Sequence, residues 1–78
     1  MSSTTYTTSR LKAADVAATM AMPFVIEVGG KAVHRQRGTG EPEFCTYNTR
    51  EDAEAELGQV WDTFPAAGVH MSGDDDGD

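Results

Sequence analysis

The chain has 78 residues and one cysteine, so it is near the lower size limit for a domain that folds without disulfides or metals. A deep substrate pocket is not expected at this size, and a single cysteine excludes an intramolecular disulfide. Six basic and 13 acidic residues give a formal net charge of -7, which favours solubility and opposes general binding to polyanions.

The amino-terminal sequence MSSTTYTTSR has no basic region followed by an apolar run, so it does not predict a signal peptide. No apolar stretch approaches the roughly 18 residues that a membrane span needs. A lone cysteine also fits a reducing compartment. We therefore expect an intracellular, cytoplasmic protein that does not bind membranes.

The first segments predict a disordered start followed by a helix. Residues 1–8 are polar without a usable period, so we expect a disordered lead-in to a single domain over 9–71. The run SRLKAADVAATMAM predicts an N-terminal helix that Ser9 caps and Pro23 ends. Val16 points away from the predicted face of this helix, as does Met20. The residues of that face are Leu11, Ala14, Ala18, Ala21 and Met22.

The next segments predict three strands. FVIEV at 24–28 alternates in the manner of a strand, and the following two glycines predict a two-residue hairpin turn. EFCTY at 43–47 predicts a third strand, after a loop over 38–42 that is too long for a tight turn. Either Phe44 faces inward or, one register over, Cys45 and Tyr47 do. The hairpin register places Val28 opposite Lys31, Ile26 opposite Val33, and Phe24 opposite Arg35.

Residues 48–64, NTREDAEAELGQVWDTF, give the strongest helix prediction. At 100° per residue their apolar side chains fall within roughly an 80° arc. Two caps are possible, Asn48 with Glu51 or Thr49 with Asp52, because each places a capping side chain three residues before a carboxylate. Gly58 is unfavourable in the middle of this helix by about 1 kcal/mol relative to alanine. The apolar stripe consists of Ala53, Leu57, Val60, Trp61 and Phe64.

These elements predict an α+β fold in which a small antiparallel three-stranded sheet is packed on one face by the C-terminal amphipathic helix. The other face is expected to be open to solvent. Val69 and Met71 are expected at the end of the domain, within reach of docking onto it, and residues 72–78 are expected to form an acidic disordered tail. The predicted core consists of Phe24, Ile26, Val28, Val33, Phe44, Leu57, Val60, Trp61 and Phe64.

Residue types that perform catalysis or bind metals are few and poorly spaced. His34, Cys45 and His70 lack the spacing of a zinc site, and the tail DDDGD lacks the arrangement of a calcium loop. A lone cysteine in a β-rich run is typical of a small buried hydrophobe, and an enzyme would need Cys45 beside a histidine in a cleft. The glycine pair precedes a strand and not a helix, so it does not predict a phosphate loop. We therefore expect no catalytic residue, metal or cofactor.

Charges of opposite sign are separated along the chain. Residues 31–37 contain three basic residues and no acid, whereas residues 51–62 contain five acids and no base. The acids extend over about 16 Å of the predicted helix at 1.5 Å per residue. These acidic residues, the predicted partner-binding set, are Glu51, Asp52, Glu54, Glu56 and Asp62. The basic set of the hairpin is Lys31, His34, Arg35 and Arg37.

In size, charge and architecture the whole chain resembles small phage-encoded inhibitors of the anti-CRISPR and DNA-mimic kind. The resemblance involves no shared motif. It implies that helix carboxylates take the place of backbone phosphates in the basic groove of a CRISPR effector or a similar nucleic-acid enzyme, in the cytoplasm of the host cell. The Asp74 to Asp78 tail would add long-range attraction to such a partner.

An alternative is a small DNA-binding accessory protein. The strand-strand-strand-helix order over residues 24–62, with FxTYNTREDAEAEL, is similar to the sheet-based DNA-binding domains at the front of phage integrases. That resemblance implies that the basic hairpin contacts DNA. The net charge of -7 opposes this interpretation. A third possibility is that the basic residues only form salt bridges with neighbouring acids.

Overall fold

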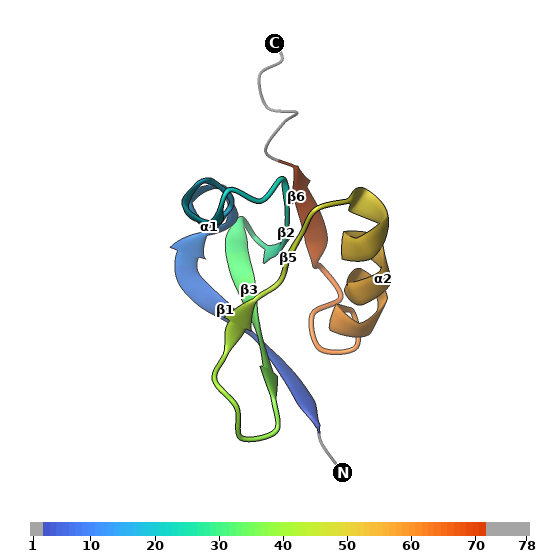
Figure 1. The fold of residues 1–78 in the computed structure, drawn as a ribbon. Helices are drawn as coiled ribbons and strands as arrows, with labels where there is room; N and C mark the ends of the chain where they lie inside the picture. Colours follow the sequence, from blue (N-terminus) through green and yellow to red (C-terminus); the bar gives the residue numbers. More distant parts are fainter. Residues whose placement is uncertain (1–2, 72–78) are drawn as a thin grey trace.

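The structure, a computed structural model, describes residues 3–71, which form an α+β fold with a six-stranded antiparallel sheet and two helices (Figure 1). The α+β class agrees with the prediction, but the sheet is twice as large as predicted. The predicted tail, 72–78, lies outside the described residues. The elements are β1 (Thr4–Lys12), α1 (Ala13–Met20), β2 (Phe24–Val28), β3 (Lys31–Arg37), β4 (Glu43–Phe44), β5 (Thr46–Tyr47), α2 (Arg50–Val60) and β6 (Gly68–Met71).

The N-terminal segment is a strand, so the predicted disordered lead-in at 1–8 is wrong for Thr4 onward. β1 pairs with β3 from Thr4 to Thr8 and again at Lys12, with an irregularity between these two stretches. Threonine and tyrosine favour strands, and Tyr6 is buried in the core at 6% exposure, which anchors the segment. The predicted helix consequently loses its first turn to β1, and α1 begins at Ala13.

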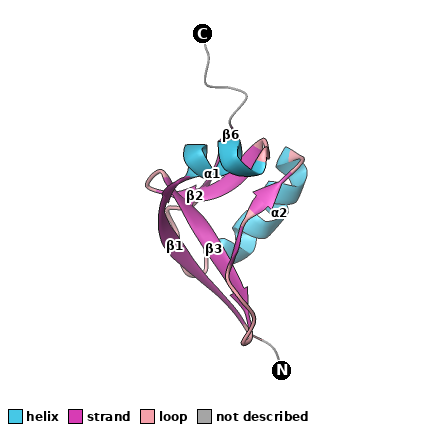
Figure 2. Cartoon of the chain, turned by 60° about the vertical axis from the view of Figure 1, so that its left-hand side comes forward, coloured by secondary structure: helices cyan, strands magenta, loops and turns pink. Residues whose placement is uncertain are grey.

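Helix α1 covers the sheet face that was predicted to be open, so the sheet lies between two helices (Figures 1 and 2). The predicted helix face was wrong. Leu11 belongs to β1 and is 51% exposed, and without it the apolar phase shifts so that Val16 points inward while Ala14 and Ala18 are exposed. The buried cluster on this side consists of Ala13, Val16, Ala17, Val25 and Ala32, with Phe44 packed against it.

The hairpin between β2 and β3 forms as predicted at its turn. Gly29 and Gly30 adopt φ angles of 61° and 87°, the left-handed region that a two-residue turn of this kind requires. Val28 pairs with Lys31 in the predicted register. The pairing of β2 with β3 ends after the next pair, so the predicted pairs of Ile26 with Val33 and of Phe24 with Arg35 are wrong. Cys45 lies between Ile26 and Val33, and Phe24 pairs with β5 on one side and β6 on the other.

Residues 43–47 enter between β2 and β3 where these strands separate. β4 pairs with β3, and β5 pairs with β2. Cys45 connects the two strands, because its N–H donates to the Val33 carbonyl at 3.2 Å and its carbonyl accepts from the Ile26 N–H at 3.0 Å. Cys45 is fully buried and joins the core under α2, while Phe44 faces the α1 side. The second of the two predicted registers for this strand is therefore the one that fills the main core.

Helix α2 uses the second predicted cap. The Thr49 hydroxyl accepts a hydrogen bond from the Asp52 N–H at 3.2 Å. The helix ends at Val60, so Trp61 follows it in a turn and is 49% exposed instead of lying in the core. Its indole N–H donates to the Ala67 carbonyl at 2.9 Å. The buried residues of the main core are Tyr6, Ile26, Val33, Cys45, Leu57, Val60 and Ala67, and the predicted core residues Phe24, Val28, Phe44 and Phe64 are half-buried.

Strand β6 completes the sheet on the far side of β2. Val69 pairs with Ile26 and packs against the main core, and Met71 pairs with Phe24. The predicted docking of Val69 and Met71 thus occurs through strand pairing.

Candidate functional site

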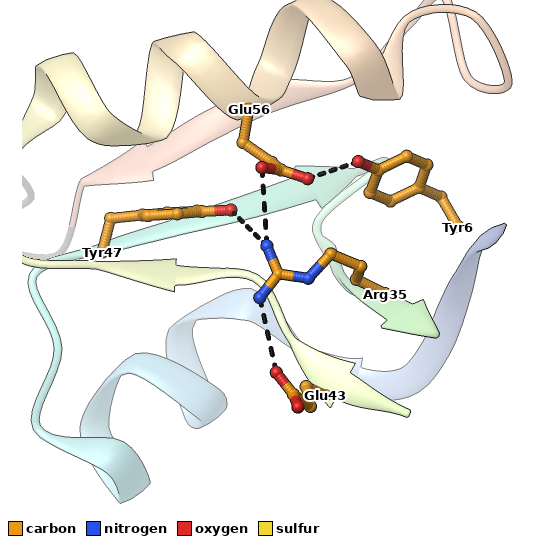
Figure 3. Close-up of polar contacts among 5 residues, drawn as sticks. All are labelled: Tyr6, Arg35, Glu43, Tyr47 and Glu56. Atoms are coloured by element: carbon orange, nitrogen blue, oxygen red, sulfur yellow. Dashed lines mark hydrogen bonds and ion pairs between the residues drawn. The ribbon is translucent and has the colours of Figure 1, made fainter. Parts of the chain in front are cut away.

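Glu56 is the one member of the predicted acidic set that points inward (Figure 3). Its side chain is 16% exposed and lies 3.5 Å from Arg35 through Oε1 and Nη1. The Tyr6 hydroxyl donates a hydrogen bond to its other carboxylate oxygen. The helical period places Glu56 at the border of the apolar stripe. At this position the ion pair with Arg35 on the sheet favours the inward orientation of the side chain.

Arg35 is the centre of a polar cluster between α2 and the sheet (Figure 3). Its Nη1 donates to the Tyr47 hydroxyl at 3.3 Å, and its Nη2 bonds Glu43 Oε1 at 3.4 Å. The Arg35 side chain is only 14% exposed, and its Nε has no hydrogen-bond partner. Arg35 is thus engaged with neighbouring acids and is not displayed for DNA. The polar cluster consists of Tyr6 on β1, Arg35 on β3, Glu43 on β4, Tyr47 on β5 and Glu56 on α2.

Burial keeps the weak acids around Arg35 protonated. Burial, together with the hydrogen bond to Glu56, raises the pKa of Tyr6 well above its ordinary value. Burial and the nearby Cys45 and Glu56 do the same to the pKa of Tyr47. Burial raises the pKa of the Cys45 thiol to about 11, although Arg35 acts in the opposite direction. A buried, protonated thiol is a poor nucleophile, so Cys45 acts as a core side chain.

The polar cluster also raises the pKa of its own cation, the Arg35 guanidinium. Burial alone would lower the pKa of the Arg35 guanidinium, but Tyr47, Cys45 and Glu56 raise the pKa overall. Arg35 therefore stays charged, and the cluster holds one cation between two carboxylates and two phenols. Its role is structural, because its contacts join α2 to strands β1 and β3 of the sheet.

The other four members of the acidic set are exposed on α2 and the turn that follows it. Glu54 forms an ion pair with Arg50, one helical turn earlier, with 2.8 Å between Glu54 Oε2 and Arg50 Nε. Carboxylates in the first turn are favourable because they face the positive end of the helix dipole. We call this surface the acidic face, and its residues are Glu51, Asp52, Glu54 and Asp62.

The predicted basic set does not form one surface. His34 is half-buried, with its ring centroid 4.3 Å from that of Phe44. Lys31 and Arg37 are exposed at opposite ends of β3, about 20 Å apart at about 3.3 Å per residue. β1 adds Lys12 directly opposite Lys31, which sequence reasoning missed because it did not predict this strand.

The described residues, 3–71, contain no cavity and no group of three or more side chains suited to hold a metal ion. Within the same range no helix is long and apolar enough to cross a membrane. Sequence reasoning also missed three members of the polar cluster, Tyr6, Glu43 and Tyr47. For Tyr6 the available signal was the run of four threonines around it at residues 4–8, because threonine and tyrosine favour strands.

Comparisons of the chain with protein-family models, with curated proteins and with solved structures find no match. A proposal for its function therefore has to start from the chemistry of its surfaces.

Proposed function

We propose that this chain is a non-enzymatic protein-interaction module that binds a basic partner surface through the acidic face. In its sharpest form it is an inhibitor that occupies the basic nucleic-acid-binding groove of a CRISPR effector or a similar enzyme, with carboxylates in place of phosphates. The observation that carries the proposal is the exposure of all four acidic-face side chains, three on α2 and Asp62 in the turn that follows it. That helix is fixed to the sheet by three buried residues, Ala53, Leu57 and Val60.

The inward position of Glu56 changes how the acidic set would act. Glu56 holds α2 against β1 and β3, so it supports the acidic face without touching the partner. A rigid support keeps the exposed carboxylates at fixed spacing, which lowers the entropy cost of binding. A basic group of the partner has to compete with Arg50 for Glu54. Glu51, Asp52 and Asp62 are consequently the stronger contacts.

A competition experiment tests this proposal. Labelled duplex DNA is bound in the groove of a CRISPR effector complex, and its displacement by the chain is followed by fluorescence anisotropy at increasing salt. We expect displacement that weakens with salt, because association is steered by exposed charges. The variant Glu51→Lys with Asp52→Lys should compete at least about tenfold less well, equivalent to about 1.4 kcal/mol.

The matched control is Asp15→Lys with Glu41→Lys, which changes the net charge equally at exposed positions away from α2. This control should compete nearly as well as the unmodified chain. Equal losses in both variants would show that only the total charge matters and would contradict the proposal. Failure of the unmodified chain to displace the DNA at low salt would contradict the nucleic-acid-groove form of it.

One observation supports the alternative function, direct DNA binding, and another opposes it. Lys12 and Lys31 are exposed and lie on paired positions of β1 and β3, so they concentrate positive charge at one end of the sheet. The guanidinium of Arg35, however, is used within the polar cluster. Retarded migration of duplex DNA at low salt, abolished by Lys12→Ala with Lys31→Ala, would favour this alternative over the acidic face.

A further inference from the structure

The outer edge of β1 pairs with no other strand among the described residues (Figure 2). The Ser3 carbonyl accepts from the Gly38 N–H at 2.7 Å. Hydrogen-bonded and non-bonded pairs alternate along an antiparallel ladder, so the backbone groups of residues 5 and 7 point to β3. The backbone N–H and C=O groups of Thr4, Tyr6 and Thr8 therefore point to the free edge.

The sequence of this edge reads the same in both directions. Residues 3–9 are STTYTTS, which is symmetric about Tyr6. If two copies of the strand pair antiparallel about a two-fold axis at Tyr6, every side chain meets its own kind. Thr4 lies opposite the partner's Thr8, and Thr5 lies opposite the partner's Thr7. Such threonine pairs are favourable cross-strand neighbours, and a two-fold interface requires this self-complementarity.

The same stretch lacks the charged residues and prolines that prevent free sheet edges from pairing with each other in other proteins. Residues 3–9 contain no charged residue and no proline. The basic side chains of Arg10 and Lys12 and the irregularity of the ladder all follow Thr8, where they end the self-complementary register. Four of the five residues in the paired stretch from Thr4 to Thr8 are exposed. The four residues of the acidic face lie on α2 and the turn that follows it, and not on this edge.

We propose that β1 is a dimerisation edge, through which two copies of the chain join by antiparallel pairing about a two-fold axis at Tyr6. The two sheets then form one continuous sheet. An interface made of one short strand from each copy lies below the roughly 1,200 Å² that stable complexes bury, so the dimer is weak and depends on concentration. This inference does not depend on the acidic face or on its partner.

Sedimentation velocity of the full chain from micromolar to millimolar concentration tests the inference. The unmodified chain should shift from monomer to dimer. The variant Thr5→Lys with Thr7→Lys places lysine opposite lysine at two points of the interface and should remain monomeric. The variant Thr5→Glu with Thr7→Lys places glutamate opposite lysine at both points and should dimerise at least as well as the unmodified chain.

The two variants change the same exposed positions, so effects on folding alone should be similar and are checked by circular dichroism. Amide hydrogen exchange on the unmodified chain locates the contact independently. The N–H groups of Thr4, Tyr6 and Thr8 should become more protected as concentration rises. A chain that stays monomeric at millimolar concentration, variants that associate equally, or protection that appears elsewhere would each overturn the proposal.

Discussion

The Tyr6 hydroxyl donates a hydrogen bond to the Glu56 carboxylate and joins β1 to α2 across 50 positions of the sequence. The same carboxylate pairs with Arg35 on β3, so the first strand, the third strand and the second helix meet at one acidic side chain. Because Glu56 is only 16% exposed, its contacts are weakly screened by solvent. Removing them is expected to cost far more than removing a surface ion pair.

Substitution of the inward carboxylate tests this expectation. Glu56→Gln keeps the shape but loses the charge, and it should lower the free energy of unfolding by about 1 to 3 kcal/mol in urea denaturation. The matched control is Glu54→Gln on the same helix, whose side chain is 51% exposed in its pair with Arg50. It should cost less than about 0.5 kcal/mol. Equal costs would mean that Glu56 is solvated in the native protein.

A double-mutant cycle measures the coupling between Arg35 and Glu56. Arg35→Met should cost about 3 to 5 kcal/mol, because it leaves the Glu56 carboxylate largely buried without its cation. Combining it with Glu56→Leu should cost less than the sum of the two single changes by about 1 to 3 kcal/mol. The apolar pair also removes the Arg35 Nε, which has no hydrogen-bond partner. Additive costs in urea denaturation would refute the coupling.

The buried thiol predicts a loss of stability in alkali. The pKa of Cys45 is about 11 in the folded protein, against roughly 8.5 for a free thiol. The folded state therefore binds the proton more tightly, and this contribution is fully present below the unfolded pKa. It is lost as the pH rises toward the folded pKa, with a limiting slope of about 1.4 kcal/mol per pH unit.

Urea denaturation at a series of pH values checks this decline. Cys45→Ala should be less stable at neutral pH because it leaves a cavity, but its stability should fall less steeply between about pH 8.5 and 10. Parallel curves for the two proteins would show that the thiol does not cause the decline. Burial raises the pKa values of Tyr6 and Tyr47 in both proteins, and this adds a separate contribution above that range, although Cys45→Ala removes the part that Cys45 adds.

Two glycines should respond in opposite directions to alanine. Gly58 lies inside α2 with nothing within 4 Å of an added Cβ, so Gly58→Ala should stabilise the protein by about 0.5 to 1 kcal/mol. Gly30 has a φ of +87° in the hairpin turn, where alanine is strained although space is open. Gly30→Ala should therefore lower the melting temperature, whereas Gly58→Ala should raise it. A lower melting temperature for both would indicate an unforeseen role of Gly58.

Features that depend on neighbouring residues were predictable from the sequence. The turn at Gly29 and Gly30 and the helix capped by Thr49 each follow from a few adjacent side chains. The end of α1 before Pro23 follows in the same way. These local preferences also gave the fold class. They could not give the number of strands, because β1 is polar apart from Tyr6 and Leu11 and its first residues resemble an unstructured terminus.

The candidate site was predictable only where the helical period decides orientation. Glu51, Asp52 and Asp62 are exposed as their positions on the predicted helix indicate, and Glu54, which flanks the apolar stripe, is exposed as well. Glu56 is at the border of the apolar stripe, and its orientation depends on Arg35, which is distant in the sequence. The prediction that basic residues of the hairpin form salt bridges with neighbouring acids is confirmed for Arg35 and Glu43. This pair forms because β4 lies beside β3 where β2 and β3 separate, and that separation was not predictable from the sequence.

Cys45 provides backbone partners to both Ile26 and Val33, so the ladder between β2 and β3 is completed by a later segment of the chain. A nascent polypeptide that has emerged from the ribosome only as far as Pro42 lacks that segment, as well as α2 and β6. β3 already has β1 and the hairpin end of β2 beside it at that stage. The Ile26 N–H, the Val33 carbonyl and the edge of β2 that pairs with β6 have no native partners until these residues follow. We therefore expect the native sheet to be completed only after residues 43–71 have emerged, and not progressively from the N-terminus.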